Sequence, residues 1–246
     1  IVPMHAAYVR HIEWNTIFLL VGMMILVGIS NRSGVFQYIA VKAAQKTKGD
    51  PVRLLVLLSL ITGVISALLD NVTTVLLLVP VTFSITKLLK LPPVPYLIAE
   101  IIASNIGGTA TLIGDPPNVM IGSANRHLTF NDFLINLGPI ALLILVVTLI
   151  LLALIYSKQL RVEAKQKEEL MRLKAEDYIS NRPLMIKSVI VLSLTIIGFL
   201  LHPFIHLDVS VVALLGAVLL LLIGTKGNEP EEVFHSVEWG TIFFFA

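Results

Sequence analysis

Long apolar runs, separated by short segments that hold nearly all of the Lys and Arg residues, constrain this chain more than any other feature. A helix of about 20 apolar residues spans the hydrocarbon core of a bilayer, which is roughly 30 Å thick. Charged residues make up only 14% of the 246 residues, whereas a soluble domain carries about 25%. We therefore expect an all-α integral membrane protein that crosses the cell membrane several times.

The order of apolar and polar segments predicts a first structural unit over residues 1–156. Its one amphipathic segment is expected to lie along the membrane interface instead of crossing it. Gly and Pro are too frequent in residues 105–118 for the segment 95–125 to form one continuous helix. The unit comprises a span at 14–30, the interfacial helix at 34–47, a helical hairpin at 52–89, a broken helix at 95–125 and a span at 137–156.

A charged connector is expected at 157–187, followed by the start of a second unit at 188–246. Basic residues in short loops mark the cytoplasmic side of a membrane protein. The basic segments are 32–53 and the connector, so both are expected in the cytoplasm. The second unit contains apolar spans at 188–201 and 209–224.

A short pattern occurs near both ends of the chain. His11-Ile-Glu-Trp-Asn-Thr-Ile-Phe18 and Ser236-Val-Glu-Trp-Gly-Thr-Ile-Phe243 share Glu, Trp, Thr, Ile and Phe in register. The charge argument places the first copy at the outer face and the second at the inner face, which is typical of the inverted repeats of transporters. Alternatively, Glu-Trp is a common interfacial anchor and the match arises by chance. The chain opens on Ile1 and stops at Ala246 within an apolar stretch, so we expect an internal piece of a longer protein with a truncated second repeat.

The first polar island, Asp70-Asn-Val-Thr-Thr74, joins two apolar arms. An Asp at the centre of a transmembrane helix costs about 2.5–3.5 kcal/mol on insertion scales, so it needs a compensating role. Either the arms cross the membrane and the island is an outer loop, or they form a re-entrant hairpin whose tip stops within the membrane. The arms are somewhat short and the island lacks Gly and Pro, which favours the hairpin.

The second polar island is Asn105-Ile-Gly-Gly-Thr-Ala-Thr-Leu-Ile-Gly-Asp-Pro-Pro-Asn118. Asp is a good N-cap and Pro suits the first helical position, so Asp115-Pro116 restarts a helix. A helix that ends near Asn105 and restarts near Asp115 leaves carbonyl groups at one break and amide groups at the other, and such ends bind ions. Gly residues would let the backbone approach an ion closely.

Together the two islands resemble the ion transporter superfamily, which includes arsenite permeases, NhaD-type sodium/proton antiporters, dicarboxylate and citrate carriers and the P protein. The second motif is the more specific of the two, and the stretch Phe18-Leu-Leu-Val-Gly-Met-Met-Ile-Leu-Val27 also fits the arsenite permease and P protein branch. The resemblance implies an elevator-type carrier with a re-entrant hairpin and a broken helix in each of two inverted repeats.

In the dicarboxylate relatives the hairpin tip reads Ser-Asn-Thr and helps to bind sodium and the substrate carboxylate. Here the same positions read Asp70-Asn71-Val72, so Asn71 carries over and Asp70 adds a negative charge. That charge argues against a dicarboxylate substrate and for cation or proton coupling, or for a neutral substrate such as arsenite. Burial favours the protonated form of a carboxyl group, which makes Asp70 and Asp115 the candidate proton carriers.

The sequence therefore predicts a secondary active ion transporter similar to arsenite or anion permeases. A sodium/proton antiporter of the same superfamily is the alternative, and a non-transporting membrane assembly subunit is the alternative from another class. An intramembrane aspartyl protease is disfavoured, because Leu112-Ile-Gly-Asp115 lacks the first Gly of the Gly-x-Gly-Asp motif. The candidate ion-binding residues are Asp70, Asn71, Thr73, Thr74, Asn105, Gly107, Gly108, Thr109, Thr111, Asp115 and Asn118, with a sodium site at Asn71, Asn105 and Gly108.

No organic cofactor is expected. The chain has no Cys and no phosphate-binding Gly loop with its Lys, so thiolate chemistry and ATP-driven pumping have no support. His202 and His206 are expected in a loop with Pro203 between them, not at a metal site. The expected partners are the lipid bilayer, a small ion and the coupling ion, sodium or a proton. Nucleic acid is not expected, and a homodimer is the assembly that we consider.

Overall fold

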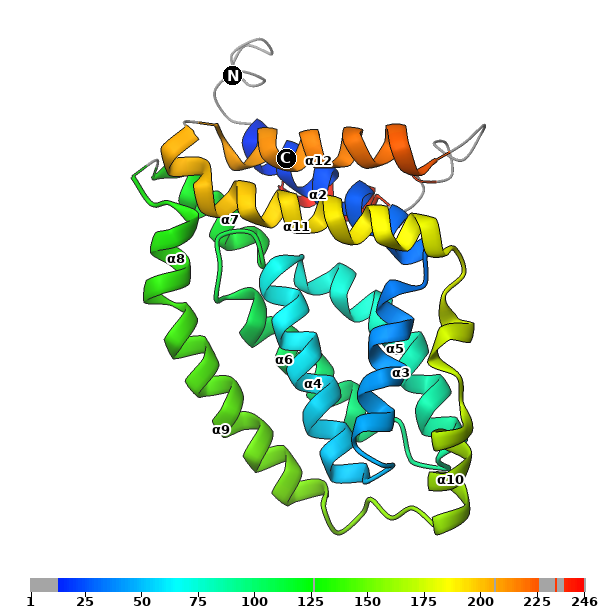
Figure 1. Ribbon diagram of the computed structural model, residues 1–246. Coiled ribbons are helices and arrows are strands. Elements are labelled where there is room, and N and C mark those ends of the chain that lie inside the picture. The colour runs from blue at the N-terminus through cyan, green and yellow to red at the C-terminus, as the bar shows by residue number, and fades with distance from the viewer. Residues whose placement is uncertain (1–12, 126, 206, 226–232, 234–236, 246) are drawn as a thin grey trace.

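The computed structural model describes residues 13–125, 127–205, 207–225, 233 and 237–245, and these form helices without any strand (Figure 1). Among these residues, five helices are long and apolar enough to cross a membrane, namely α2 (Trp14–Arg32), α4 (Pro51–Leu68), α5 (Asn71–Leu88), α9 (Gly138–Tyr156) and α11 (Arg182–Ile205). The shorter helices are α3 (Val35–Lys46), α6 (Val94–Gly108), α7 (Pro116–Ala124), α8 (Phe130–Asn136), α10 (Ala164–Arg172), α12 (Val209–Gly224) and α14 (Trp239–Phe245). The expected all-α membrane class is confirmed.

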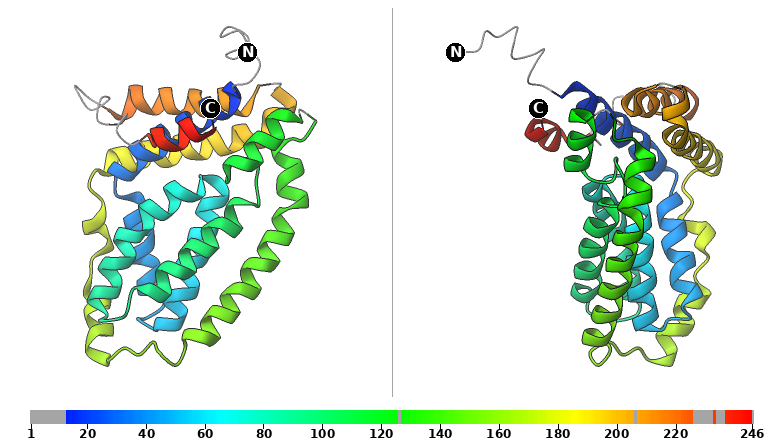
Figure 2. Two further views of the ribbon diagram at one scale, coloured as in Figure 1. Left: turned by 180° about the vertical axis from the view of Figure 1, so that it is seen from behind. Right: turned by 90° about the vertical axis from the view of Figure 1, so that its left-hand side faces the viewer.

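The helices form two groups whose axes cross, as Figures 1 and 2 show. Helices α2, α11, α12 and α14 form a layer across one end of a bundle that contains α3, α4, α5, α6 and α9. We call these the layer and the bundle. Within the layer, α2 and α12 pack so closely that a Cβ added at Gly22 would lie 2.9 Å from the backbone carbonyl carbon of Ala213.

The repeated Glu-Trp pattern produces the same local structure at both of its copies. Trp14 and Trp239 each begin a helix. The ring of each Trp lies tilted against that of a Phe four residues later, with ring centroids 5.8 Å apart for Trp14 and Phe18 and 6.5 Å apart for Trp239 and Phe243. Helix α14 packs against α2. The opposite membrane orientation of the two copies stays a prediction.

Outward faces of the layer and of α9 carry many large exposed apolar side chains. Examples are Leu143 and Leu154 on α9, Ile190 on α11 and Leu222 on α12, which are 53–76% exposed. In water such faces would be unstable, whereas lipid tails solvate them. The lipid bilayer is therefore the natural surrounding of these faces.

Two details differ from the sequence prediction. Residues 130–136 form a helix, α8, which begins with a capping box between Thr129 and Asp132. Helix α11 continues to Ile205, so His202 is helical and the expectation of a loop there was wrong, while His206 lies outside the described residues. Pro203 has no N–H to donate to the carbonyl group of Phe199, but His202 Nδ1 lies 2.9 Å from that oxygen, and its N–H tautomer donates to it.

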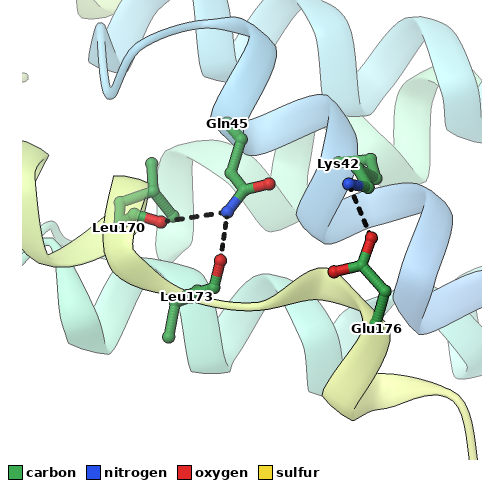
Figure 3. A network of polar contacts seen from close by, with 5 residues as sticks. All are labelled: Lys42, Gln45, Leu170, Leu173 and Glu176. Carbon is green, nitrogen blue, oxygen red and sulfur yellow. Dashed lines mark hydrogen bonds and ion pairs between the residues drawn. The ribbon is translucent and has the colours of Figure 1, made fainter.

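Hydrogen bonds and an ion pair hold the segment between α9 and α11 against α3 (Figure 3). Gln45 Nε2 donates to the carbonyl oxygens of Leu170, at 3.3 Å, and Leu173, at 2.6 Å. Lys42 Nζ lies 2.9 Å from Glu176 Oε1, and this hydrogen bond holds the pKa of the exposed Glu176 below its ordinary value. Helix α11 begins at Arg182, so the predicted connector ends inside a helix.

Within the bundle, α4 and α6 run side by side at backbone contact. Tyr96 Oη donates to the carbonyl oxygen of Pro51 at 2.8 Å near one end of the pair. Near the other end, a Cβ added at Gly107 would lie 2.0 Å from the carbonyl oxygen of Gly63 and 2.7 Å from its Cα. Because both residues are Gly, the two helices can approach without any side chain between them.

Replacing Gly107 with Ala should separate α4 from α6. Overpacking a tight contact costs about 1–3 kcal/mol, so we expect thermal unfolding of the purified protein in detergent to shift clearly downward. Gly240→Ala is the matched control, because no atom of the described residues lies within 4 Å of a Cβ at Gly240. Equal melting temperatures for the two variants would contradict the close approach.

Candidate ion-binding site

The hairpin between α4 and α5 turns within two residues, Leu69 and Asp70. Asp70 has an extended backbone and caps α5, because its Oδ1 accepts from the backbone N–H of Thr73 at 2.8 Å. Thr74 Oγ1 donates to the carbonyl oxygen of Asp70 at 2.8 Å. The sequence predicted residues 70–74 as one polar tip of the hairpin, but Asn71, Thr73 and Thr74 belong to the first turn of α5.

The helix break spans residues 109–115, since α6 continues through Gly108 and α7 begins at Pro116. Thr111 Oγ1 donates to the carbonyl oxygen of Ala67 at 2.5 Å and accepts from the N–H of Gly114 at 3.1 Å. Asn118 Nδ2 donates across the break to the carbonyl oxygens of Thr109, at 3.3 Å, and Thr111, at 2.9 Å. These bonds tie the break to the end of α4 and to the first turn of α7.

Gly residues let the break fold onto itself. A Cβ at Gly108 would lie 2.5 Å from the carbonyl oxygen of Gly114, and a Cβ at Gly114 would lie 2.6 Å from that of Gly108. Ser66 Oγ donates to the carbonyl oxygen of Ser104 at 2.6 Å and fastens α4 beside them. Gly107 and Gly108 therefore serve backbone packing, and their approach to an ion stays a prediction.

The hairpin tip and the helix break meet at a pair of amide side chains. Asn71 Nδ2 donates to Asn105 Oδ1 at 3.0 Å. Asn71 Oδ1 is buried and has no hydrogen-bond partner among the described residues. A groove of about 240 Å³ opens beside the pair, lined by Asn71, Val72, Val75, Leu76, Ile101, Ser104 and Asn105. A buried carbonyl oxygen without a donor costs free energy unless a ligand supplies one.

Two acids lie at the same end of the bundle. Asp70 is 4% exposed, and Asp115 lies within electrostatic range of it. Asp115 stands at the N-cap position of α7, yet its side chain makes no capping hydrogen bond. The capping role expected for this carboxyl group is therefore absent, and its oxygen atoms are available to a cation or a proton.

The remaining predicted residue is Thr109, the first residue of the break. Its side chain is exposed, and its Oγ1 donates to the carbonyl oxygen of Ile106 in the last turn of α6 at 2.7 Å. Thr73, by contrast, also lines a separate cavity of about 350 Å³ between α2 and α5. That cavity includes the polar residues Asn31, Arg32 and Glu238. It lies where the bundle meets the layer.

Sequence reasoning missed Glu100, which is 1% exposed in the middle of α6. Its Oε1 accepts from Thr82 Oγ1 of α5 at 2.6 Å, and its Oε2 has no partner among the described residues. The signal was present, because a lone acid within the apolar stretch 96–104 is costly in a membrane. It was overlooked because no other polar residue stands next to it in the sequence.

Comparison with known proteins decides the family. A family model described as citrate transporter matches residues 1–246. The chain belongs to the citrate transporter family. An uncharacterized transporter of Mycobacterium tuberculosis is 43% identical over 249 residues, covering 100% of this chain and 57% of that protein. The P protein of Sus scrofa is 34% identical over 315 residues, covering 99% of this chain and 37% of the P protein.

A 46 kDa membrane protein of Mycobacterium leprae is 43% identical over 235 residues, covering 96% of this chain and 54% of that protein. The chain thus spans about half the length of these mycobacterial relatives. The resemblance to the ion transporter superfamily is confirmed. Family membership and the apolar helices show a multi-pass membrane protein, and the cell membrane is the location expected for bacterial members of the citrate transporter family.

Replacing Asn118 with Leu should destabilise the helix break. The carbonyl groups of Thr109 and Thr111 would lose their donor. Only Thr111 is buried, and leaving a buried polar group unsatisfied costs about 1–3 kcal/mol. The measurement is thermal unfolding in detergent, with Asn136→Leu as the control, because the exposed Asn136 amide donates only within its own helix. An Asn118→Leu variant as stable as the control would show that the amide does not hold the break.

Proposed function

We propose that this chain forms part of a secondary active transporter for a small ion or neutral oxyacid, similar to arsenite and anion permeases. The buried, unpartnered Oδ1 of Asn71 beside the helix break carries the proposal. An oxygen in that setting is suited to coordinating a cation that moves with the substrate. Membership of the citrate transporter family supports transport in general.

The break favours a cation over an anion. Helix N-termini bind anions through free backbone N–H groups, but α7 begins with Pro116 and Pro117, which have none. The next N–H, of Asn118, donates to the carbonyl oxygen of Asp115 at 3.0 Å. The carboxyl groups of Asp70 and Asp115 add oxygen atoms that can bind sodium or a proton at the same end. We infer that this half of the site holds the coupling cation, sodium or a proton.

This observation also favours the second candidate, a sodium/proton antiporter. An antiporter needs only cation sites, and the oxygen atoms of Asn71, Asn105 and the two acids supply them. The two candidates share the cation site and differ in whether arsenite crosses the membrane. A membrane assembly subunit, in contrast, has no use for a buried amide oxygen without a donor.

For the transport step we propose an elevator motion in which the bundle moves against the layer. The two groups have crossed axes and are joined through α3 and through the segment before α11 (Figures 1 and 2). The cavity lined by Arg32 of α2 and Thr73 of α5 lies between them. Space at such a boundary supports relative movement of the two groups.

The test uses the full-length protein in proteoliposomes, with radioactive sodium and arsenite as the two probes. Asn71→Leu removes the unpartnered oxygen, and Asp70→Asn removes the charge while keeping an oxygen that can cap α5. We expect both to reduce sodium-dependent flux by at least tenfold, about 1.4 kcal/mol of lost binding. Asn125→Leu, at an exposed helix end, should leave flux unchanged.

The outcomes of this test distinguish an arsenite permease from a sodium/proton antiporter. Flux of arsenite driven by sodium supports the permease, whereas sodium flux with counter-movement of protons and no arsenite supports the antiporter. If the unsubstituted protein moves neither probe, or if Asn71→Leu and Asp70→Asn transport as well as Asn125→Leu, the proposed ion site is wrong.

A further inference from the structure

Glu100 lies inside the bundle, away from the hairpin tip and the helix break. It is 1% exposed, and Thr82 Oγ1 donates to its Oε1 at 2.6 Å. Thr82 is itself 1% exposed, and its own carbonyl oxygen accepts from Thr86 Oγ1 at 2.7 Å. Glu100 Oε2 is buried and unpartnered among the described residues. The carboxyl group is therefore held at one oxygen and open at the other.

Within the part of the chain that the structure describes, Glu100 has no charged partner. Helices α4, α5 and α9 pack against α6. Among the described residues, no ion pair or hydrogen bond joins Glu100 to any titratable group of these four helices. The titratable groups on them are Arg53 at the start of α4, Asp70 and Lys87 at the two ends of α5, Tyr156 at the end of α9 and Tyr96 on α6 itself. A carboxylate buried without a counter-charge is costly, and binding one proton removes the charge.

We propose that Glu100 is a proton-binding site, separate from the site at Asn71, and that it takes up and releases one proton in each transport cycle. The proton binds at Oε2, which neutralises the carboxylate, and leaves from the same oxygen to water. The proposal rests on the proposed transport function and adds a proton to the ions that move in it. It also moves the proton away from Asp70 and Asp115, which lie nearer to the Asn71 site.

The position of Glu100 connects it to the groove. Glu100 and Ser104 are four residues apart on α6, so they share one face of the helix, with a rise of about 6 Å between them. Ser104 lines the groove beside Asn71 and is fastened to α4 by Ser66. A shift of α6 when the groove is occupied would therefore also move the carboxyl group of Glu100 relative to its partner on α5.

Helix α5 has a weak point close to that partner. Pro80 stands inside α5, two residues before Thr82. Pro has no N–H to donate to the carbonyl group four residues earlier, so helices bend most readily there. Bending at Pro80 would separate Thr82 from Glu100 and admit water to Oε2. This gives the proton a route on and off the buried carboxyl group.

The first experiment detects the proton without transport. Infrared difference spectra of the full-length protein in lipid, recorded across a pH titration, should show a protonated carboxyl band at neutral pH. We expect Glu100→Gln to lose this band, Thr82→Val to shift it because the C=O group loses its hydrogen bond, and Glu169→Gln to keep it, since Glu169 is exposed on α10. Identical spectra for Glu100→Gln and Glu169→Gln would overturn the proposal.

The second experiment measures proton movement in proteoliposomes with a trapped pH-sensitive dye, driven by a sodium gradient or by arsenite. We expect Glu100→Gln to lose proton movement and the pH dependence of flux, while Glu169→Gln behaves like the unsubstituted protein. Unchanged proton movement in Glu100→Gln would overturn the proposal. If the unsubstituted protein moves neither sodium nor arsenite, the proposed function fails, and the infrared band alone decides whether Glu100 holds a proton.

Discussion

The structure depends on satisfying the backbone groups that two interruptions of helical structure leave open in the same place. Lipid offers no hydrogen bonds, so the carbonyl and amide groups at a hairpin turn and at a helix break must find partners within the protein. They find them in each other's segments. Thr111 binds the carbonyl group of Ala67 at the end of α4, Ser66 binds that of Ser104 on α6, and Asn118 spans the break. The Gly63–Gly107 contact brings the helices close enough for these bonds to form.

These hydrogen bonds between the hairpin and the helix break separate the polar residues that stabilise the fold from those that remain free to bind an ion. Thr74, Thr111 and Asn118 each donate to a backbone carbonyl group and complete the fold. Asn71 donates to Asn105 but keeps an unpartnered oxygen, and Asp115 makes no capping bond. Both groups lie near the hairpin tip and the helix break, and the atoms that they leave free are oxygen atoms. That chemistry is the basis for proposing a cation.

Much of the helical order could be predicted from the sequence, because long apolar runs and Pro-marked turns are local signals. The span at 14–30, the two arms of the hairpin and the restart of a helix at Pro116 all depend on such signals. The exact turn at Leu69 and Asp70 was harder, since Asn71, Thr73 and Thr74 read as loop residues until the cap formed by Asp70 is seen. The continuation of α11 through Pro203 likewise depends on a contact of His202 that composition does not reveal.

The contacts that define the candidate site were beyond sequence reasoning for another reason. Asn71 meets Asn105, and Thr82 meets Glu100, only because α4, α5 and α6 pack together. The two Gly residues that allow α4 and α6 to pack so closely, Gly63 and Gly107, lie far apart in the sequence, so no local pattern reveals their contact. The polar islands identified which residues to suspect. They did not show that Gly107 and Gly108 pack backbone against backbone, that the Thr109 hydroxyl bonds back to α6, or that an isolated Glu100 is buried.

The central claim is that the hairpin tip lies at membrane depth and does not reach the outer surface. Single-cysteine labelling in an otherwise Cys-free protein tests it directly, and residues 1–246 contribute no Cys. Val72 is 43% exposed beside Asn71, so Val72→Cys can be compared with Asn125→Cys near the expected outer face and Glu169→Cys in the expected cytoplasmic segment. A membrane-impermeant maleimide added outside intact cells should label Asn125→Cys but neither of the others. Labelling of Val72→Cys as fast as Asn125→Cys would make the tip an ordinary outer loop and contradict the account.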